Sequence, residues 1–277
     1  MQPQIKTSKN SKIITIDEAK LGTDYRQLGK GDEGTVYNYN NKYAIKTFDL
    51  FLETKQLDKL KQKYNKIEAM QKLNDESFCF PQGNVLGSNN NRLGCFMNLI
   101  EPDQQEINFS YLFHMNDRND VFRHLIDADI AIQRIHKKDV RIGDVRDTNI
   151  LIDQNHNIKF IDTDNYAYED FDFDLPSWRI RVIKEKYGSY LSNQDTDIIL
   201  FSIMALRNIL KDPKCTCSTD PEYFYKKIKK LPISKNAKND LIWIFSNSCE
   251  RPYIGDVLTE MKNNSDVFVK QKKFEMK

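Results

Sequence analysis

The pattern of apolar and polar positions changes character along the chain. Through the first hundred residues, short apolar runs rich in Tyr, Val and Ile are separated by turn residues, and such runs predict strands. The dipeptide Asn40-Asn41 is a clear turn of this kind. The predicted strands are Tyr25–Leu28, Thr35–Tyr39, Tyr43–Phe48 and Leu93–Ile100. This part of the chain therefore predicts a small antiparallel sheet.

Longer segments place apolar residues at three- and four-residue steps among Lys and Gln, which is typical of amphipathic helices. The predicted helices are Leu50–Leu73, Val121–His136, Asp197–Leu210, Glu222–Lys230, Asn236–Phe245 and Ile254–Met261. Two short apolar runs, Ile150–Ile152 and Ile158–Ile161, flank a polar turn and predict a hairpin. Because a mostly helical region follows the sheet, the sequence predicts an α+β fold.

Composition and charge narrow the class of protein. The chain has 277 residues, 39% of them apolar, with 16 Phe and 13 Tyr, which predicts a folded core rather than disorder. The formal net charge of +2 favours neither nucleic acid nor an anionic membrane as a partner. No apolar run approaches the roughly 20 residues of a membrane span, and the polar start MQPQIKTSKN lacks the apolar core of a secretion signal. We therefore expect a cytoplasmic protein.

The five cysteines are odd in number and scattered along the chain. Cys215 and Cys217 are the only two with the spacing of metal ligands, and no second Cys or His pair lies near them in sequence to complete a zinc site. We expect reduced thiols, and a metal role for this pair is the less favoured alternative.

Acidic residues are crowded at one end of the predicted hairpin. The polar residues concerned are Asp144, Asp147, Asn149, Asp162 and Asp164. Like charges so close together repel one another and require a cation, a proton or solvent to offset them. Asparagine and aspartate turns at a hairpin end explain one or two of these residues but not all of them. A metal site is the favoured interpretation, since Mg²⁺ prefers oxygen ligands of this kind.

Three glycines stand between two predicted strands in the spacing G-x-G-x-x-G, at Gly29, Gly31 and Gly34, and Val36 follows. Glycine lets a backbone approach phosphate groups closely and point its N–H groups at them. A dinucleotide-binding fingerprint requires a helix after the last glycine, whereas a strand is predicted here, so that interpretation is disfavoured.

A lysine, Lys46, ends the apolar strand Tyr43-Ala44-Ile45. A strand lysine is ordinarily exposed to solvent. The alternative is a cation held over nucleotide phosphates by a carboxylate, and replacement of such a lysine is expected to leave folding nearly intact while activity falls by orders of magnitude. Glu68 of the first predicted helix offers that carboxylate, because it lies near the apolar edge of the helix.

The order of these motifs resembles a eukaryotic-type protein kinase, particularly the divergent bacterial serine/threonine kinases, over about Leu28–Met261. The resemblance implies that Lys46 contacts the phosphates of ATP and pairs with Glu68. It implies that Asp144 is the catalytic aspartate and that Arg146 stands where serine/threonine kinases carry a lysine. Asn149 and Asp162 are implied as the Mg²⁺ ligands.

The resemblance also implies a fold and a nucleotide pocket. A small β-rich lobe at 21–100 and a larger helical lobe at 101–265 are expected with ATP between them, an extension at 1–20 and a basic tail at 266–277. Met97 looks like the residue behind the adenine pocket, and the strand end after it looks like the hinge. The implied nucleotide-binding residues are Gly29, Gly31, Gly34, Val36, Ala44, Lys46, Glu68, Met97, Asn98, Leu99 and Ile100.

Two features of the helical region resemble the same family. Asp197, at the start of an apolar helix, resembles the aspartate that braces the catalytic loop from beneath. The run Cys249-Glu250-Arg251-Pro252 resembles the family's Arg-Pro element, and Glu185 lies at a suitable distance to pair with Arg251.

The chain also departs from the family pattern in two places. Ile142-Gly143-Asp144 replaces His-Arg-Asp, so control through a phosphorylated activation loop is not expected. Asp162-Thr163-Asp164 replaces Asp-Phe-Gly, so an apolar plug and a flexible pivot are lost. Asp164 can face the metal site with Asp162, or turn outward and cap the loop; the outward orientation is favoured.

The function expected from the resemblance is ATP- and Mg²⁺-dependent phosphorylation of serine or threonine in a protein substrate, including the enzyme itself. Arg146 carries the preference for these hydroxyls. A small-molecule kinase of the aminoglycoside or choline kinase type is the alternative enzyme. A nucleotide-binding pseudokinase is the alternative binding protein, although pseudokinases generally lack at least one of the motif residues present here.

Overall fold

The computed structural model describes residues 5–7, 12–31, 33–49, 57–100, 108–173, 178–189, 191–246 and 250–264. The predicted basic tail, Cys249 and the start of the first predicted helix lie outside these residues. The chain is mixed α+β, as predicted, and divides into two compact units. Residues 1–102 with 159–174 form the sheet unit, and residues 103–158 with 175–277 form the helical unit.

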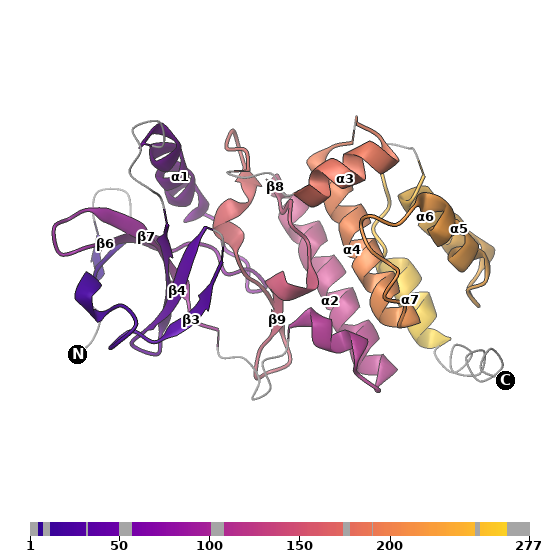
Figure 1. The fold of residues 1–277 in the computed structure, drawn as a ribbon. Helices are drawn as coiled ribbons and strands as arrows, with labels where there is room; N and C mark the ends of the chain where they lie inside the picture. The colour runs from indigo at the N-terminus through magenta and orange to yellow at the C-terminus, as the bar shows by residue number, and fades with distance from the viewer. Residues whose placement is uncertain are drawn as a thin grey trace. The chain divides into compact units, whose positions relative to one another are not determined.

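The sheet unit is built on one twisted sheet with the strand order β1-β2-β6-β7-β5-β4-β3 (Figure 1). Its strands are β1 (Ile5–Thr7), β2 (Lys12–Thr15), β3 (Gln27–Lys30), β4 (Gly34–Tyr39), β5 (Tyr43–Phe48), β6 (Gly83–Leu86) and β7 (Arg92–Asn98). Neighbouring strands are antiparallel except β2 and β6, which are parallel. Residues predicted as an extension therefore supply two strands, and β6 was not predicted at all. These strands are three or four residues long, too short for an alternating pattern to stand out.

Alternate residues of β5 face two different apolar clusters, as the period of a strand requires. Tyr43 and Ile45 pack into one cluster, together with Ile14, Val85 and Phe96. Ala44 packs on the other side of the sheet, in the cluster Ala44, Tyr64, Ile67, Cys79, Cys95 and Met97. Lys46 follows Ala44 by two residues, so its side chain leaves the sheet on the side of that second cluster.

Helix α1 (Leu57–Met70) contributes Tyr64 and Ile67 to the second cluster. Its buried positions include two lysines, Lys63 and Lys66, although the sequence predicted that the lysines of this helix face solvent. The ammonium of Lys66 donates to the carbonyl of Asp172 at 3.3 Å. A short 3-10 helix, η1 (Glu18–Lys20), precedes the glycine turn.

The segment 159–174 belongs to the sheet unit, although the sequence placed it in the helical region. It contains the end of β10 (Ile158–Phe160), the 3-10 turn η5 (Thr163–Asn165) and β11 (Ala167–Tyr168). The backbone of Phe160 bonds to Ser77 at 2.7 Å and to Cys79 at 2.9 Å, and the Phe160 ring stacks on Phe78 at 4.5 Å. These contacts fix the strand end from which Asp162 follows.

The helical unit is organised around α2, which packs on α4 and α7 (Figure 1). Its helices are α2 (Arg118–His136), α3 (Trp178–Tyr187), α4 (Asn193–Leu210), α5 (Pro221–Lys229), α6 (Lys235–Ile244) and α7 (Gly255–Asn263), with 3-10 turns η3 (Phe109–Phe113) and η4 (Asp147–Asn149). The short strands β8 (Val140–Arg141) and β9 (Ile150–Ile152) flank η4. The predicted turn after β9 is closed by a bond from the Asp153 N–H to the Asn157 carbonyl at 2.9 Å.

Helix α3 was not predicted from the sequence. Its buried residues Ile180, Ile183 and Tyr187 nevertheless follow three- and four-residue steps, which is the helical signal that was overlooked.

No helix in the described ranges combines the length and the apolar character needed to cross a membrane. Four of the cysteines, Cys79, Cys95, Cys215 and Cys217, are buried free thiols.

His124 of α2 makes the stability of the helical unit depend on pH. The side chain is buried, and its closest polar contact is the guanidinium of Arg123 at 3.4 Å. Burial first, and the charge of Arg123 second, lower the pKa of His124 from 6.5 to about 4. The unfolded chain therefore binds a proton that the folded chain rejects, so this contribution to stability is complete above about pH 6.5 and is lost as the pH falls.

We expect His124→Gln to remove this dependence. Between pH 7 and pH 5 the wild type should lose about 2 kcal/mol of unfolding free energy relative to the variant. The chain's two tryptophans, Trp178 and Trp243, lie in the helical unit, so urea unfolding followed by tryptophan fluorescence measures this loss. His114→Gln is the matched control, because His114 is exposed. Parallel pH profiles for the wild type and His124→Gln would contradict the assignment.

Candidate functional site

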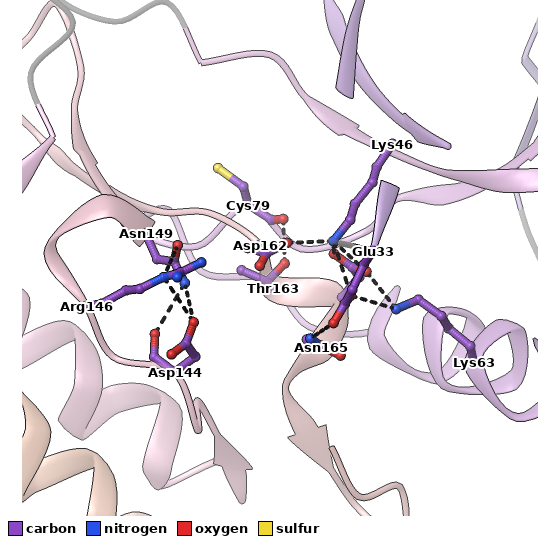
Figure 2. A network of polar contacts seen from close by, with 11 residues as sticks. Glu33, Lys46, Lys63, Cys79, Asp144, Arg146, Asn149, Asp162, Thr163 and Asn165 are labelled. Atoms are coloured by element: carbon purple, nitrogen blue, oxygen red, sulfur yellow. Dashed lines mark hydrogen bonds and ion pairs between the residues drawn. The ribbon is translucent and has the colours of Figure 1, made fainter. Parts of the chain in front are cut away.

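The ammonium of Lys46 is the centre of a buried ion-pair cluster in the sheet unit (Figure 2). It lies 2.5 Å from Oδ1 of Asp162, 2.9 and 3.1 Å from the two carboxylate oxygens of Asp164, and 3.6 Å from Oε2 of Glu33. Burial alone would lower the pKa of Lys46, but Asp164, Asp162 and Glu33 outweigh it and raise the pKa above its ordinary value. Lys46 is therefore a permanent cation inside the protein and not an exposed strand lysine.

Asp162 presents a carboxylate that is both held and accessible. Its backbone adopts the left-handed conformation with φ of 60°, which ends the extended geometry of β10. A non-glycine residue adopts this conformation at some energetic cost, and such residues are often found at functional sites. One oxygen contacts Lys46, while the side chain as a whole is 34% exposed. The next residue anchors the turn, because the hydroxyl of Thr163 donates to the carbonyl of Cys79 at 2.6 Å.

Asp164 points into the sheet unit and is fully buried, so the favoured prediction of an outward, loop-capping orientation is wrong. Its carboxylate contacts Lys46 from one side and Lys63 of α1, at 3.1 Å, from the other. Burial would raise the pKa of Asp164, but the two lysines hold it well below its ordinary value. The chain does leave the extended geometry here, as expected, but the turn η5 directs the Asp164 side chain inward and not outward.

Glu68 is not the partner of Lys46, and this predicted pairing is wrong in the structure. The Glu68 carboxylate accepts from Nδ2 of Asn84 at 3.3 Å and lies 3.7 Å from the Arg92 guanidinium. Helix α1 instead presents Lys63 to the ion-pair cluster. Helix α1 and strand β5 are therefore linked through Lys63 on the helix and the carboxylate of Asp164, which contacts both Lys63 and Lys46.

The three glycines have different physical roles. A side chain on Gly34 would approach the carbonyl oxygen of Thr47 to 1.9 Å, so glycine is required there by the pairing of β4 with β5. Gly29 and Gly31 have open space around the position of a Cβ atom. Glu33 lies in this turn, and its carboxylate contacts Lys46, Lys63 and the side-chain amide of Asn165 (Figure 2).

The residues predicted to hold an adenine gather on one side of the sheet. Ala44 and Met97 are opposite one another in the pairing of β5 with β7, and Val36 and Leu99 pack at the margin of the same apolar cluster. The Leu99 N–H donates to the carbonyl of Lys42 at 3.0 Å, which extends the sheet past β7. Val36 and Leu99 are only partly buried, so they can offer apolar surface to a flat ring. Asn98 is exposed.

Asp144, Arg146 and Asn149 form a second group, in the helical unit, and are bonded to one another (Figure 2). Nε of Arg146 lies 3.0 Å from the Asp144 carboxylate and donates to Oδ1 of Asn149 at 2.9 Å. Nδ2 of Asn149 donates in turn to the Asp144 carboxylate at 3.2 Å. Arg179 of α3, which the sequence did not single out, binds the other Asp144 oxygen at 3.0 Å. The structure thus brings together three residues predicted to act in catalysis and metal binding.

Asp197 braces the segment that leads to Asp144, as predicted. The carboxylate is fully buried and accepts from the backbone N–H groups of Ile142 and Gly143, both at 2.7 Å. Nε2 of His136 lies 3.1 Å from the same carboxylate. Gly143 has φ of 75°, a conformation that glycine adopts without strain and that arginine, the residue of the family motif, would resist.

We expect Asp197→Asn to destabilise the helical unit by about 3 kcal/mol. An amide replaces one acceptor oxygen by an NH₂ group, so a buried N–H group of the loop or the His136 ring loses its partner. Urea unfolding followed by tryptophan fluorescence measures the loss, and Asp256→Asn, at an exposed position, is the matched control. Equal stability of the two variants would show that Asp197 does not stabilise the backbone at Ile142 and Gly143.

The predicted pairing of Arg251 with Glu185 is wrong. Arg251 is buried, donates to the carbonyls of Ile244 and Ser246, and lies 3.6 Å from Asp195 in the first turn of α4. Glu185 is exposed and lies 3.9 Å from Arg181 of its own helix. Arg251 therefore anchors α4 and the segment after α6, and not the α3 segment.

The predicted metal ligands can be compared with what Mg²⁺ requires. Within the described ranges, no group of three or more His, Cys, Asp or Glu side chains is arranged to hold a metal by itself. Mg²⁺ in nucleotide-dependent enzymes is instead bound by one or two protein oxygens together with waters and substrate phosphates. The accessible carboxylate of Asp162 is a donor of this kind, whereas the amide oxygen of Asn149, in the helical unit, is bonded to Nε of Arg146.

Sequence reasoning missed Glu33, Lys63 and Arg179. Lys63 was detectable, because it lies four residues before Ile67 and seven before Met70, on the same buried face of α1. Glu33 occupies a variable position of the G-x-G-x-x-G motif, and only the glycines of that motif were assigned a role. Arg179 lies in the helix that was not predicted.

No protein-family model matches the chain, and no curated protein matches it in sequence.

Proposed function

We propose that the protein is an ATP- and Mg²⁺-dependent phosphotransferase of the protein-kinase type. The observation that carries the proposal is the 2.5 Å contact between the buried ammonium of Lys46 and the accessible carboxylate of Asp162. A permanent cation beside a carboxylate with a free face is suited to bind a phosphate group and its counter-ion together. The two residues are 116 apart in sequence, and the sequence predicted phosphate binding for Lys46 and metal binding for Asp162 without pairing them.

Each residue has a distinct task in this proposal. Lys46 binds phosphate oxygens of the nucleotide, and Asp162 beside it is a ligand of the Mg²⁺, which neutralises phosphate charge when bound. The family resemblance implies Asn149 of the helical unit as a further ligand. The turn with Gly29 and Gly31 offers backbone N–H groups to the phosphates, and the apolar surface of Val36, Ala44, Met97 and Leu99 receives the adenine, with backbone contacts from the adjoining strand end at Asn98.

Asp144 is proposed as the residue that orients the acceptor hydroxyl and accepts its proton. Arg146 and Asn149 support this role, since both bond to the Asp144 carboxylate or to each other and fix its orientation. Arg146 is also a cation two residues beyond the base, and we propose that it neutralises the phosphate being transferred. This is the basis for preferring serine and threonine hydroxyls of a protein, including the enzyme's own chain.

The test is transfer of label from [γ-³²P]ATP by the wild-type protein, with Mg²⁺ and with EDTA. Label on the protein itself or on a generic basic protein, dependent on Mg²⁺, is the expected result. ATP consumption only in the presence of a metabolite extract would favour a small-molecule kinase. Nucleotide binding without any transfer would identify a pseudokinase and overturn the proposed activity.

A further inference from the structure

Lys46 is held in place from the loop after β10 and not from helix α1. Three carboxylates surround its ammonium, and they differ in exposure. The side chain of Asp162 is 34% exposed and that of Glu33 is 20% exposed, whereas that of Asp164 has no exposed surface. Asp162 and Glu33 can release Lys46 and contact solvent or a ligand instead, whereas the fully buried Asp164 cannot.

The Asp164 carboxylate joins two elements of secondary structure. Both of its oxygens accept from Lys46 of β5, at 2.9 and 3.1 Å. Oδ2 also lies 3.1 Å from the ammonium of Lys63 on α1. One buried carboxylate thus pairs with two cations and connects strand β5 to helix α1.

Lys63 is built into this position. Its side chain is 8% exposed, and its ammonium lies 4.5 Å from the centre of the Phe48 ring, a favourable distance for a cation over an aromatic face. Its ammonium contacts the carboxylates of Asp164 and, at 3.4 Å, of Glu33 in the glycine turn. Glu68, five residues further along the helix, is bonded to Asn84 and Arg92.

We infer that Asp164 is the positioning residue for Lys46, in place of a helix glutamate, and that Lys63 is the group through which α1 is tied to that carboxylate. The catalytic part of this inference rests on the proposed function, in which Lys46 binds phosphate. A consequence is that α1, β5 and the turn Thr163–Asn165 form one electrostatic unit.

The pairing can be tested without any enzymatic activity. A double-mutant cycle between Lys46→Met and Asp164→Asn should show a coupling of about tenfold in the unfolding equilibrium constant, as expected for contacting charges. The cycle between Lys46→Met and Glu68→Gln should show a much smaller coupling. Native-state hydrogen exchange of the β5 amides reports on the sheet unit, which contains no tryptophan. A larger coupling to Glu68 than to Asp164 would overturn the inference.

Kinetics test the positioning role. Asp164→Asn should lower kcat/KM for ATP by about 100-fold, because small displacements of a positioned group have effects of this size. Glu68→Gln should lower it much less, and Asp170→Asn, the same change at an exposed position, is the control. Val85→Ala weakens the opposite apolar cluster of the same unit and should leave the kinetics of the folded protein unchanged. If Val85→Ala lowers kcat/KM as much as Asp164→Asn does, the effect of Asp164→Asn comes from weakened packing of the unit, and Asp164 has only a structural role.

A second variant keeps the test decisive if Asp164→Asn does not fold. The double variant Lys63→Glu/Asp164→Asn moves the buried carboxylate from the loop to the helix, and should recover at least tenfold in kcat/KM over Lys63→Met/Asp164→Asn, which has no carboxylate at either place. Equal activity of the two double variants would overturn the role of this carboxylate. A wild type without phosphotransfer but with the expected coupling would refute the proposed function and leave the pairing intact.

Discussion

Asp144→Asn is expected to reduce phosphoryl transfer by about 10²- to 10⁴-fold, the usual contribution of a general base. The amide has nearly the shape of the carboxylate and can accept from either Arg146 or Arg179 through its single oxygen, but it cannot take up a proton. The Asp144 side chain is 28% exposed and its ion pairs are only partly shielded, so the change in unfolding free energy should be about 1 kcal/mol or less.

The measurement is the initial rate of label transfer from ATP at saturating Mg²⁺, with tryptophan fluorescence to establish that the variant is folded. Asp139→Asn is the matched control, because Asp139 lies five residues earlier, is exposed and has φ of 54°, which asparagine tolerates. A folded Asp144→Asn variant with the rate of the control would exclude Asp144 as the base.

Elements with a clear local pattern, including the short strands β9 and β10, were predictable from the sequence, whereas β1, β2, β6 and α3 were not. Strand β5 and helices α2, α4 and α6 agree with their predicted ranges to within a few residues. Strands β2 and β6 pair with each other across 67 intervening residues, and no local sequence signal predicts that pairing. Such strands are stabilised by contacts with residues distant in sequence, and four residues are too few to show an alternating pattern of apolar and polar positions.

For the candidate site, residue types were easier to predict than partners. The acids, the strand lysine and the support given by Asp197 were found because each stands in a recognisable local order. The partner of Lys46 was not, since periodicity indicates a buried face of a helix and not which residue on it meets a given atom. Lys63 and Glu68 are five residues apart, or about 140° around a helix, so only one of them can reach Lys46.

Burial of the ion-pair cluster was the feature least accessible to sequence analysis. A lysine-rich helix usually carries its lysines in water, and α1 instead buries Lys63 and Lys66 beside the acids of the loop. The cost of removing the charges of Lys46, Lys63 and Asp164 from water is offset by their ion pairs. The sequence-based expectation that Lys46 can be replaced with little effect on folding therefore fails, because it assumed an exposed ion pair.

Lys46→Met should affect both stability and activity. Methionine fills much of the same volume, but Asp164 then lies fully buried with Lys63 as its remaining cation in the cluster, and breaking a buried ion pair costs about 3–5 kcal/mol. The phosphate also loses its cation in a buried site, which should reduce phosphoryl transfer by about 10³-fold.

Hydrogen exchange of the β5 amides measures the first effect, and label transfer by the fraction that remains folded measures the second. Lys42→Met is the control, because Lys42 is exposed and lies just before the same strand. Loss of stability with normal transfer would make Lys46 a structural residue alone, because its charge would then serve Asp164 and not a nucleotide. Loss of transfer with unchanged stability would instead mean that Asp164 does not depend on Lys46 for its charge, and would contradict the buried ion pair from which both effects are derived.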